Sequence, residues 1–137
     1  FHFDHRGYAA HVAEVSTDGD RFTLDKVYSA VDVGPILNLS GAKNQVEGAV
    51  MDGLSTTQLE TTIAGGSAQQ TNFHAHPMLR IDKAPEVECH FIQSDNSPTG
   101  LGEPPFAPVA PAIANAIFAA SGTRIRELPF RRAGFTL

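Results

Sequence analysis

The chain has 137 residues, of which 42% are hydrophobic, so it can form one domain with its own core. Its formal net charge is −5, and an acidic chain without a basic stripe argues against nucleic acid as a partner. Only 18% of the residues are charged, below the usual share, which indicates that other protein covers part of the surface. The single cysteine excludes an internal disulfide.

Two strands joined by a tight turn are predicted near the start of the chain. Residues 9–16 are largely apolar on both alternating faces, as in a strand that is covered on both sides. A second strand, 21–33, is rich in valine and aromatic residues. The intervening Asp18-Gly19 is a strong hairpin signal, because glycine adopts positive φ at little cost. Residues 1–8 are expected to be irregular.

An amphipathic helix is predicted over residues 41–59, where apolar side chains recur at three- and four-residue spacing after Ser40, the predicted N-cap. Gly48 and Gly53 each cost this helix about 1 kcal/mol relative to alanine. Helical glycines at such a cost usually mark the close approach of another backbone or of a ligand. A glycine turn follows, and residues 67–85 are expected to form loop and short extended pieces.

The second half of the chain predicts a third strand over residues 86–93 and a loop rich in glycine and proline over 94–106. A final helix is expected over 107–121, with Gly122 after its end and a possible short strand over 125–130. Cys89 alternates with apolar residues in the third strand, which favours a structural thiol over a nucleophile. The element order predicts an α+β fold, a mixed β-sheet with two main helices packed on one face.

Glu103 is the first candidate for chemistry, within Gly100-Leu101-Gly102-Glu103-Pro104-Pro105. The glycines allow a large ligand to approach the backbone closely, and the prolines are expected to hold the following backbone extended. A carboxylate presented in this way suits a general base, which must reach the proton that it removes. The alternative interpretation is an acidic residue favoured by the dipole at a helix start.

Gln45, in the first helix, is the second candidate, because its amide carries donors and an acceptor that suit a polar cofactor. The alternative is a solvated helix face. His74, His76 and His90 could form a metal site in principle, but nothing in the sequence brings His90 near the other two.

Taken in order, five stretches resemble the molybdopterin-binding large subunit of the xanthine oxidase and aldehyde oxidoreductase family. They cover most of residues 9–130, and their order and spacing are more specific than any one of them. The stretches are Ala30 to Gly34 with Asn38, Asn44 to Gly48, Gln70 to His74, Gly100 to Pro105, and Pro108 to Ala120. The run from Thr71 to Arg80 most resembles the isoquinoline 1-oxidoreductase-like β subunits, which include membrane-associated aldehyde dehydrogenases.

The resemblance implies that residues 1–137 are a single domain, the C-terminal portion of such a subunit. It implies an enzyme that oxidises an aldehyde or N-heterocycle with water-derived oxygen, with Glu103 as general base at the molybdenum centre. Among the implied cofactor-binding residues, Gln45 matches a position that contacts the molybdopterin, and Gly100 and Gly102 match the turn that lets the base reach the metal. The expected partners are the remainder of that subunit and a second subunit that carries iron–sulfur clusters. A periplasmic or membrane-associated location is favoured over a cytoplasmic one.

The family segments that carry most of the molybdopterin contacts are absent from these residues. The chain alone is therefore expected to hold no cofactor and to be catalytically silent. Two other classes stay open. The first is a non-catalytic assembly domain with the same fold, which the low charge content and apolar strand faces favour. The second is a small metal-binding protein that uses the three histidines.

Overall fold

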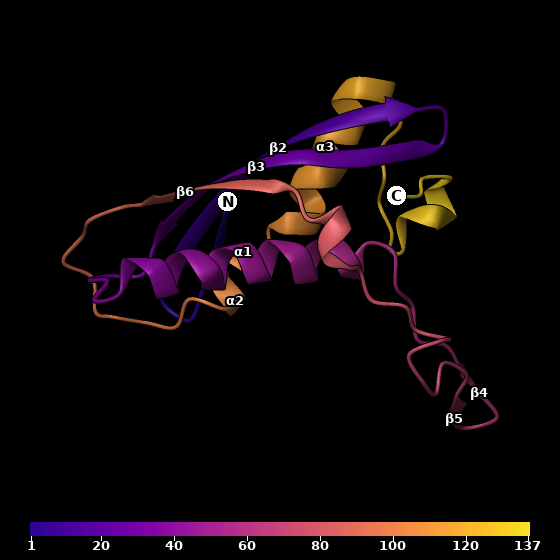
Figure 1. Cartoon of the computed structure of the whole chain (residues 1–137), viewed down its shortest axis with the longest axis horizontal. Coiled ribbons are helices and arrows are strands. Elements are labelled where there is room, and N and C mark those ends of the chain that lie inside the picture. Colours follow the sequence, from indigo (N-terminus) through magenta and orange to yellow (C-terminus); the bar gives the residue numbers. More distant parts are fainter.

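The computed structural model describes residues 1–137 and shows a four-stranded sheet in the order β1-β2-β3-β6, with helices beside it (Figure 1). The first three strands are antiparallel neighbours, whereas β6 is parallel to β3. The predicted α+β class with a mixed sheet is confirmed. The elements are β1 (His2–Asp4), β2 (Gly7–Asp18), β3 (Arg21–Asp32), α1 (Leu39–Thr56), β4 (Ile63–Ala64), β5 (Ser67–Ala68), η1 (Ile81–Lys83), β6 (Glu86–Phe91), α2 (Glu103–Phe106), α3 (Val109–Ser121) and η2 (Phe130–Ala133).

The long β2–β3 hairpin forms where the sequence predicts it, and Gly19 in its turn has a φ of +62°. A bulge interrupts the pairing between Leu24 and Lys26, whose partners on β2 are consecutive residues. The extra residue, Asp25, changes which residues share a face. As a result, Leu24 and Val27 both point into the core, although they lie three residues apart.

Helices α1 and α3 cover one face of the sheet, as predicted, and both contribute to its main apolar core. A smaller cluster of Ala9, Val31, Val33 and Val46 lies between α1 and the sheet. The largest core side chains come from β3, α1, α3 and the C-terminal segment. Those with 2% exposure or less include Phe22, Val27, Leu54, Ile113, Ile117 and Phe130. Burial of such side chains stabilises the fold by roughly 1.5–3 kcal/mol each.

The two helices meet at a glycine. A Cβ atom added to Gly53 would lie 2.6 Å from the Cβ of Val109 on α3, so only glycine fits at this contact. A close approach does occur at Gly53, but the neighbour is the Val109 side chain rather than the backbone or ligand that the sequence predicts. At Gly48 an added Cβ would meet nothing within 4 Å, so that position faces open space.

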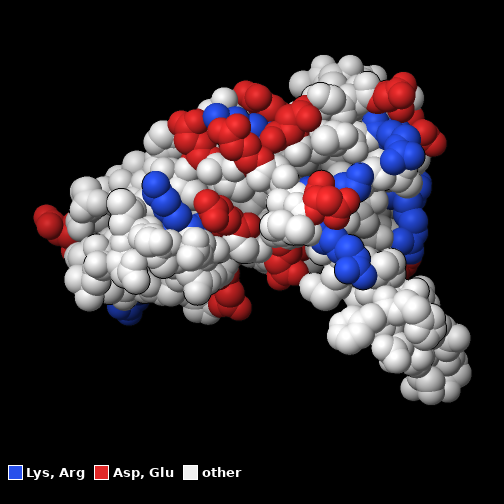
Figure 2. Space-filling view, viewed as in Figure 1, with Lys and Arg blue, Asp and Glu red and all other residues white.

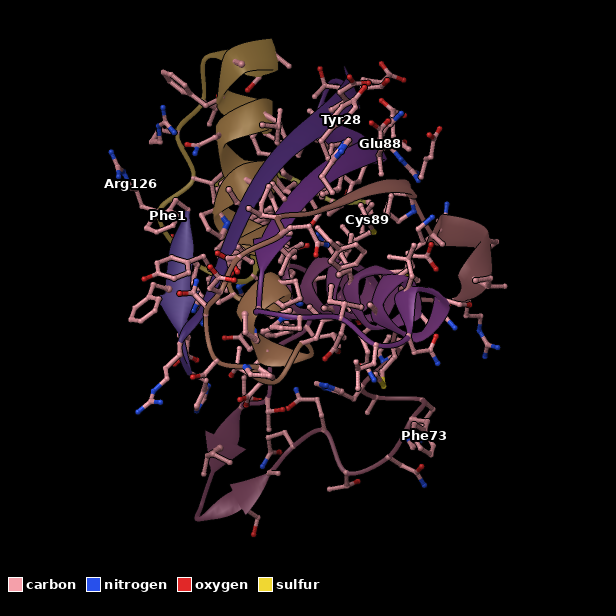
Figure 3. All side chains as sticks on the ribbon, turned by 90° about the vertical axis from the view of Figure 1, so that its left-hand side faces the viewer. Phe1, Tyr28, Phe73, Glu88, Cys89 and Arg126 are labelled. Atoms are coloured by element: carbon pink, nitrogen blue, oxygen red, sulfur yellow. The ribbon has the colours of Figure 1, made fainter.

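The outer face of the sheet, turned away from α1, carries a charged cluster (Figures 2 and 3). The Lys26 ammonium contacts Glu86 at 2.9 Å and Glu88 at 2.8 Å, and these carboxylates raise the pKa of Lys26. Surface ion pairs such as those of Lys26 contribute little to stability. Toward β1 the same face of the sheet is apolar, and Val12 is 65% exposed there.

The expectation that residues 1–8 are irregular is wrong. Residues His2–Asp4 form β1, which pairs with β2 through a tight turn at His5 and Arg6. The Tyr8 ring packs against Phe3 with 4.6 Å between ring centroids, and such cross-strand aromatic contacts hold a short edge strand in register.

The boundaries of the first helix differ from the prediction. Helix α1 begins at Leu39, and the N-cap is Asn38, whose side-chain oxygen accepts a hydrogen bond from the Gly41 N–H at 2.9 Å. Ser40 is therefore not the cap. The helix ends at Thr56, before the predicted end at residue 59, and the N–H of Thr57 bonds back to the carbonyl of Leu54.

The helix predicted over 107–121 corresponds to α3, and a separate short helix, α2, precedes it. Pro108 has no N–H to continue a helix from α2, so α3 starts at Val109, and α3 ends before Gly122, which has the expected left-handed φ of +76°. The possible strand over 125–130 is absent. The segment leads instead into η2, and only a single bridge joins Thr136 to the sheet at Arg21.

Residues 61–79 form an arm that projects from the body beyond the end of α1 and carries the β4–β5 hairpin (Figure 1). The arm contains no aspartate, glutamate, lysine or arginine, and Figure 2 shows it as an uncoloured projection. Its base is fastened by Arg131, which donates to the Gln58 carbonyl and to Glu60, each at 2.8 Å. No helix of the chain is both long and apolar enough to cross a membrane.

Candidate functional site

A hollow of about 400 Å³ lies between α1 and α2. Three site residues expected from the sequence, Gln45, Gly102 and Glu103, come together around it, although the two helices are distant in the chain. Gly100 does not line the hollow, and a Cβ there would meet nothing within 4 Å. The lining residues are Gln45, Gly48, Ala49, Asp52, Gly102, Glu103 and Phe106.

Glu103 is the first residue of α2, and its side chain is 78% exposed. The expected extended backbone after it is wrong. Pro104 and Pro105 are buried in the first turn of α2, where the fixed φ and missing N–H of proline suit a helix start. The carboxylate is thus presented from a helix end rather than from an extended loop.

Gln45 reaches the hollow from α1. A Cβ on Gly102 would lie 3.7 Å from the side-chain oxygen of Gln45, so the glycine backbone passes close to the amide. One turn along, Gly48 leaves the wall of the hollow open. Asp52 adds a second carboxylate to the lining, which makes the hollow acidic and unsuited to an anion.

The prolines of α2 fix it to the sheet. A Cβ on Gly7 would lie 3.0 Å from the Pro104 side chain, which marks a close contact with the start of β2. The Pro105 carbonyl accepts a hydrogen bond from Nε2 of His11 at 2.6 Å. Because a carbonyl only accepts, the His11 proton is on Nε2. Burial lowers the pKa of His11, which therefore favours the neutral ring.

Asp32, at the end of β3, holds the loop that leads to Glu103. Its carboxylate accepts hydrogen bonds from the Gly34 N–H at 3.2 Å, the Ser94 hydroxyl at 2.6 Å and the Asn96 amide at 3.0 Å. Gly34 has a φ of +76°, and a Cβ there would lie 2.5 Å from the Asn96 carbonyl oxygen. Asp32 and Gly34, both within the run from Ala30 to Gly34, therefore hold the loop that leads to Glu103, although neither lines the hollow.

The histidines proposed as a metal site do not gather. His90 lies on the outer face of the sheet, with its Nε2 2.9 Å from Glu88, whereas His74 and His76 belong to the arm. The His/Asp/Glu set with ligand atoms within 4.8 Å of one another is Asp4, His5 and Glu103. Sequence reasoning missed Asp4 and His5, because nothing in residues 1–8 predicts the turn that brings them to α2.

Cys89 points from β6 toward α1 and is half-buried (Figure 3). Burial raises the pKa of its thiol, with a smaller contribution from Glu47. A raised thiol pKa disfavours the reactive thiolate, in agreement with the structural role that the strand pattern predicts.

Solved structures share this fold. The Cu,Mo-CO dehydrogenase matches with a TM-score of 0.76 and 16% identity, over 96% of this chain and 19% of that one. The aldehyde oxidoreductase of Desulfovibrio desulfuricans matches with a TM-score of 0.76 and 24% identity, over 90% of this chain and 14% of that one.

Curated relatives are more similar in sequence. The membrane-bound aldehyde dehydrogenase [pyrroloquinoline-quinone] of Gluconacetobacter polyoxogenes is 42% identical, over 89% of this chain and 16% of the relative. The isoquinoline 1-oxidoreductase subunit beta of Brevundimonas diminuta is 35% identical, over 90% of this chain and 17% of the relative. The chain thus spans only a small part of the relatives that it matches.

Residues 2–85 match the molybdopterin cofactor-binding domain family. Gln45 lies within the matched residues, whereas Glu103 lies beyond them. The chain therefore belongs to the molybdopterin cofactor-binding domain family.

Proposed function

We propose that the chain supplies part of the active site of a molybdenum hydroxylase that oxidises an aldehyde or an N-heterocycle with water-derived oxygen. Glu103 is the general base. The observation that carries the proposal is the single hollow in which Glu103 meets Gln45, a residue of the family-matched segment. A carboxylate that lines the same hollow as Gln45 would lie within reach of a proton at a cofactor bound there.

The lining fits one part of a molybdopterin better than another. Gln45 offers amide donors and an acceptor to the polar edge of a pterin ring, and Gly48 leaves open the space that a side chain would fill. Asp52 would repel the cofactor's phosphate. We therefore assign the pterin edge to this hollow and the phosphate to protein outside this chain.

The residues of this chain have distinct roles in the proposal. Glu103 accepts the proton that the water-derived hydroxyl group loses as its oxygen attacks the substrate carbon. Gln45 orients the cofactor through its amide, and Gly102 lets the backbone pass close to that amide. When bound, molybdenum in its pterin cofactor would supply the two-electron oxidation, and iron–sulfur clusters on a partner subunit would accept the electrons.

The exposure of Glu103 indicates where the rest of the site lies. A side chain that is 78% exposed has no wall to exclude water, and such a wall strengthens the interactions of a catalytic carboxylate. The remainder of the molybdopterin-binding subunit supplies that wall, and this chain alone is catalytically silent.

Replacement of Glu103 by glutamine in the complete enzyme tests the base. Glutamine keeps the shape of the side chain but cannot accept the proton, so turnover should fall to background while molybdenum content stays at the wild-type level. The matched control is Glu127→Gln, which alters an exposed glutamate remote from the hollow. Near-normal turnover of the Glu103→Gln enzyme would remove Glu103 from the catalytic role.

A second candidate function, a non-catalytic assembly domain, is favoured by the uncharged arm and the apolar end of the outer sheet face. Molybdenum content and self-association of the isolated chain distinguish the two. Stoichiometric molybdenum on a stable monomer would refute the assembly function. A metal-free chain that self-associates, with wild-type turnover of the Glu103→Gln enzyme, would favour it.

A further inference from the structure

The turn between β1 and β2 lies against the residue that we propose as the base. Nδ1 of His5 is 3.3 Å from a carboxylate oxygen of Glu103 and 3.0 Å from Asp4. Asp4 and His5 are far from Glu103 in the sequence, yet the ligand atoms of all three lie within 4.8 Å of one another.

The turn is fastened to the Glu103 segment by its backbone as well. The hydroxyl of Thr99 donates to the His5 carbonyl, and Pro104 packs at the Gly7 backbone. The His5 N–H also donates to the Asp4 carboxylate at 2.8 Å. The backbone of His5 is therefore held beside Glu103, and its imidazole moves less freely than the side chain of a frayed terminal residue would.

The backbone of the turn is unusual for its residues. His5 has a φ of +47° and Arg6 a φ of +65°, a region in which residues other than glycine are uncommon and which costs energy. Glycine would form the same turn at less cost. A histidine at a position that favours glycine or asparagine points to a use for its side chain.

The position of Nδ1 fixes where the imidazole carries a proton. Two carboxylates face this nitrogen, and a bare lone pair there would be repelled by both. Nδ1 therefore bears hydrogen, and its contacts with the Glu103 and Asp4 oxygens are attractive. Because the pair is exposed in this chain, it adds little to folding stability, and its effect is on orientation.

We propose that His5, held by Asp4, is a positioning residue that directs the Glu103 carboxylate over the hollow. The inference rests on the proposed role of Glu103 as base. The contact of Nδ1 with a Glu103 oxygen at 3.3 Å limits the rotation of an otherwise free side chain, and a general base transfers protons efficiently only when its oxygen is held within reach.

Variants of His5 in the complete enzyme test the proposal. His5→Ala removes the donor and should lower kcat on the order of ten-fold with KM unchanged. His5→Asn should restore most of kcat, because its amide donates a hydrogen bond and asparagine tolerates positive φ. The control is Arg6→Ala, a neighbour in the same turn with the same sign of φ and no contact with Glu103. It should behave as the wild type.

A crystal structure of each complete enzyme provides a readout that does not depend on turnover. Glu103 should occupy one orientation in the wild type and in His5→Asn, and several in His5→Ala. Wild-type turnover and a single Glu103 orientation in His5→Ala would overturn the role of His5, even while Glu103→Gln remains inactive. An active Glu103→Gln enzyme would instead overturn the base, and the orientation of Glu103 in His5→Ala would still decide whether His5 positions it.

Discussion

Nε2 of His11 on β2 donates a hydrogen bond of 2.6 Å to the carbonyl oxygen of Pro105, and this bond ties the sheet to the short helix that begins with Glu103. The other ring nitrogen, Nδ1, is buried without a partner. Protonation of the ring would place an unpaired N–H in that buried position, which agrees with the lowered pKa of His11.

The first prediction concerns the pH dependence of stability. Burial holds the folded-state pKa of His11 below its unfolded value of about 6.5, so the unfolded chain binds more protons in the interval between them. The free energy of unfolding should therefore fall as pH drops below about 6.5 and stop changing from this source below the folded pKa. Denaturant unfolding at several pH values measures it.

His11→Gln is the matched variant, because its amide can still donate to Pro105 but does not titrate. The free energy of unfolding of wild type should decline more steeply than that of His11→Gln as the pH is lowered below neutrality. Parallel curves for the two proteins would contradict the assignment to His11.

The second prediction concerns Asp32, whose carboxylate accepts from Gly34, Ser94 and Asn96. Asp32→Ala leaves these donors unpaired and should destabilise the chain by about 1–3 kcal/mol, with faster amide hydrogen exchange in residues 94–102. Asp95→Ala, an exposed carboxylate in the same loop, is the control. Equal exchange in the two variants would show that Asp32 does not hold the loop.

The third prediction uses Gly53, which contacts Val109. Alanine has the higher helix propensity, but its Cβ would lie 2.6 Å from the Val109 side chain. Because the core cannot give way by that much without strain, Gly53→Ala should destabilise the chain by about 1–3 kcal/mol. Thermal or denaturant unfolding measures the change, and a neutral result would mean that α1 and α3 can separate at little cost.

The fourth prediction uses Gly48, which faces the hollow. An added Cβ meets nothing within 4 Å, so Gly48→Ala should stabilise the isolated chain by up to about 1 kcal/mol. In the complete enzyme the same methyl group would enter the space that we assign to the pterin edge, and molybdenum content should fall. A Gly48→Ala enzyme that is more stable and retains all of its molybdenum would place the cofactor elsewhere.

Local signals in the sequence predicted some of these elements well. Asp18-Gly19 determines the β2–β3 hairpin by itself, and Gly122 ends α3, because both depend on glycine at positive φ. The N-terminal strand could not be predicted in this way. It depends on contacts of Phe3 with Tyr8 and on a turn at His5 that contains no glycine.

The site was only partly accessible from the sequence. Glu103 and Gln45 were expected from their local patterns and from the family resemblance, but no periodicity indicates that α1 and α2 enclose one hollow. Gly100, by contrast, was expected at the site because it matches a family motif, but it does not line the hollow in the structure. The extended backbone predicted at Pro104-Pro105 is wrong, because a proline pair suits an extended segment and the first turn of a helix equally well.

The uncharged arm has a consequence for proteolysis. Residues 61–79 contain no lysine or arginine, so trypsin has no site within the arm despite its projection from the body. Phe73, on the segment of the arm that follows β5, is 81% exposed (Figure 3) and offers chymotrypsin an accessible bond. Susceptibility to one protease and not to the other thus distinguishes an uncovered arm from one that the rest of a larger assembly shields.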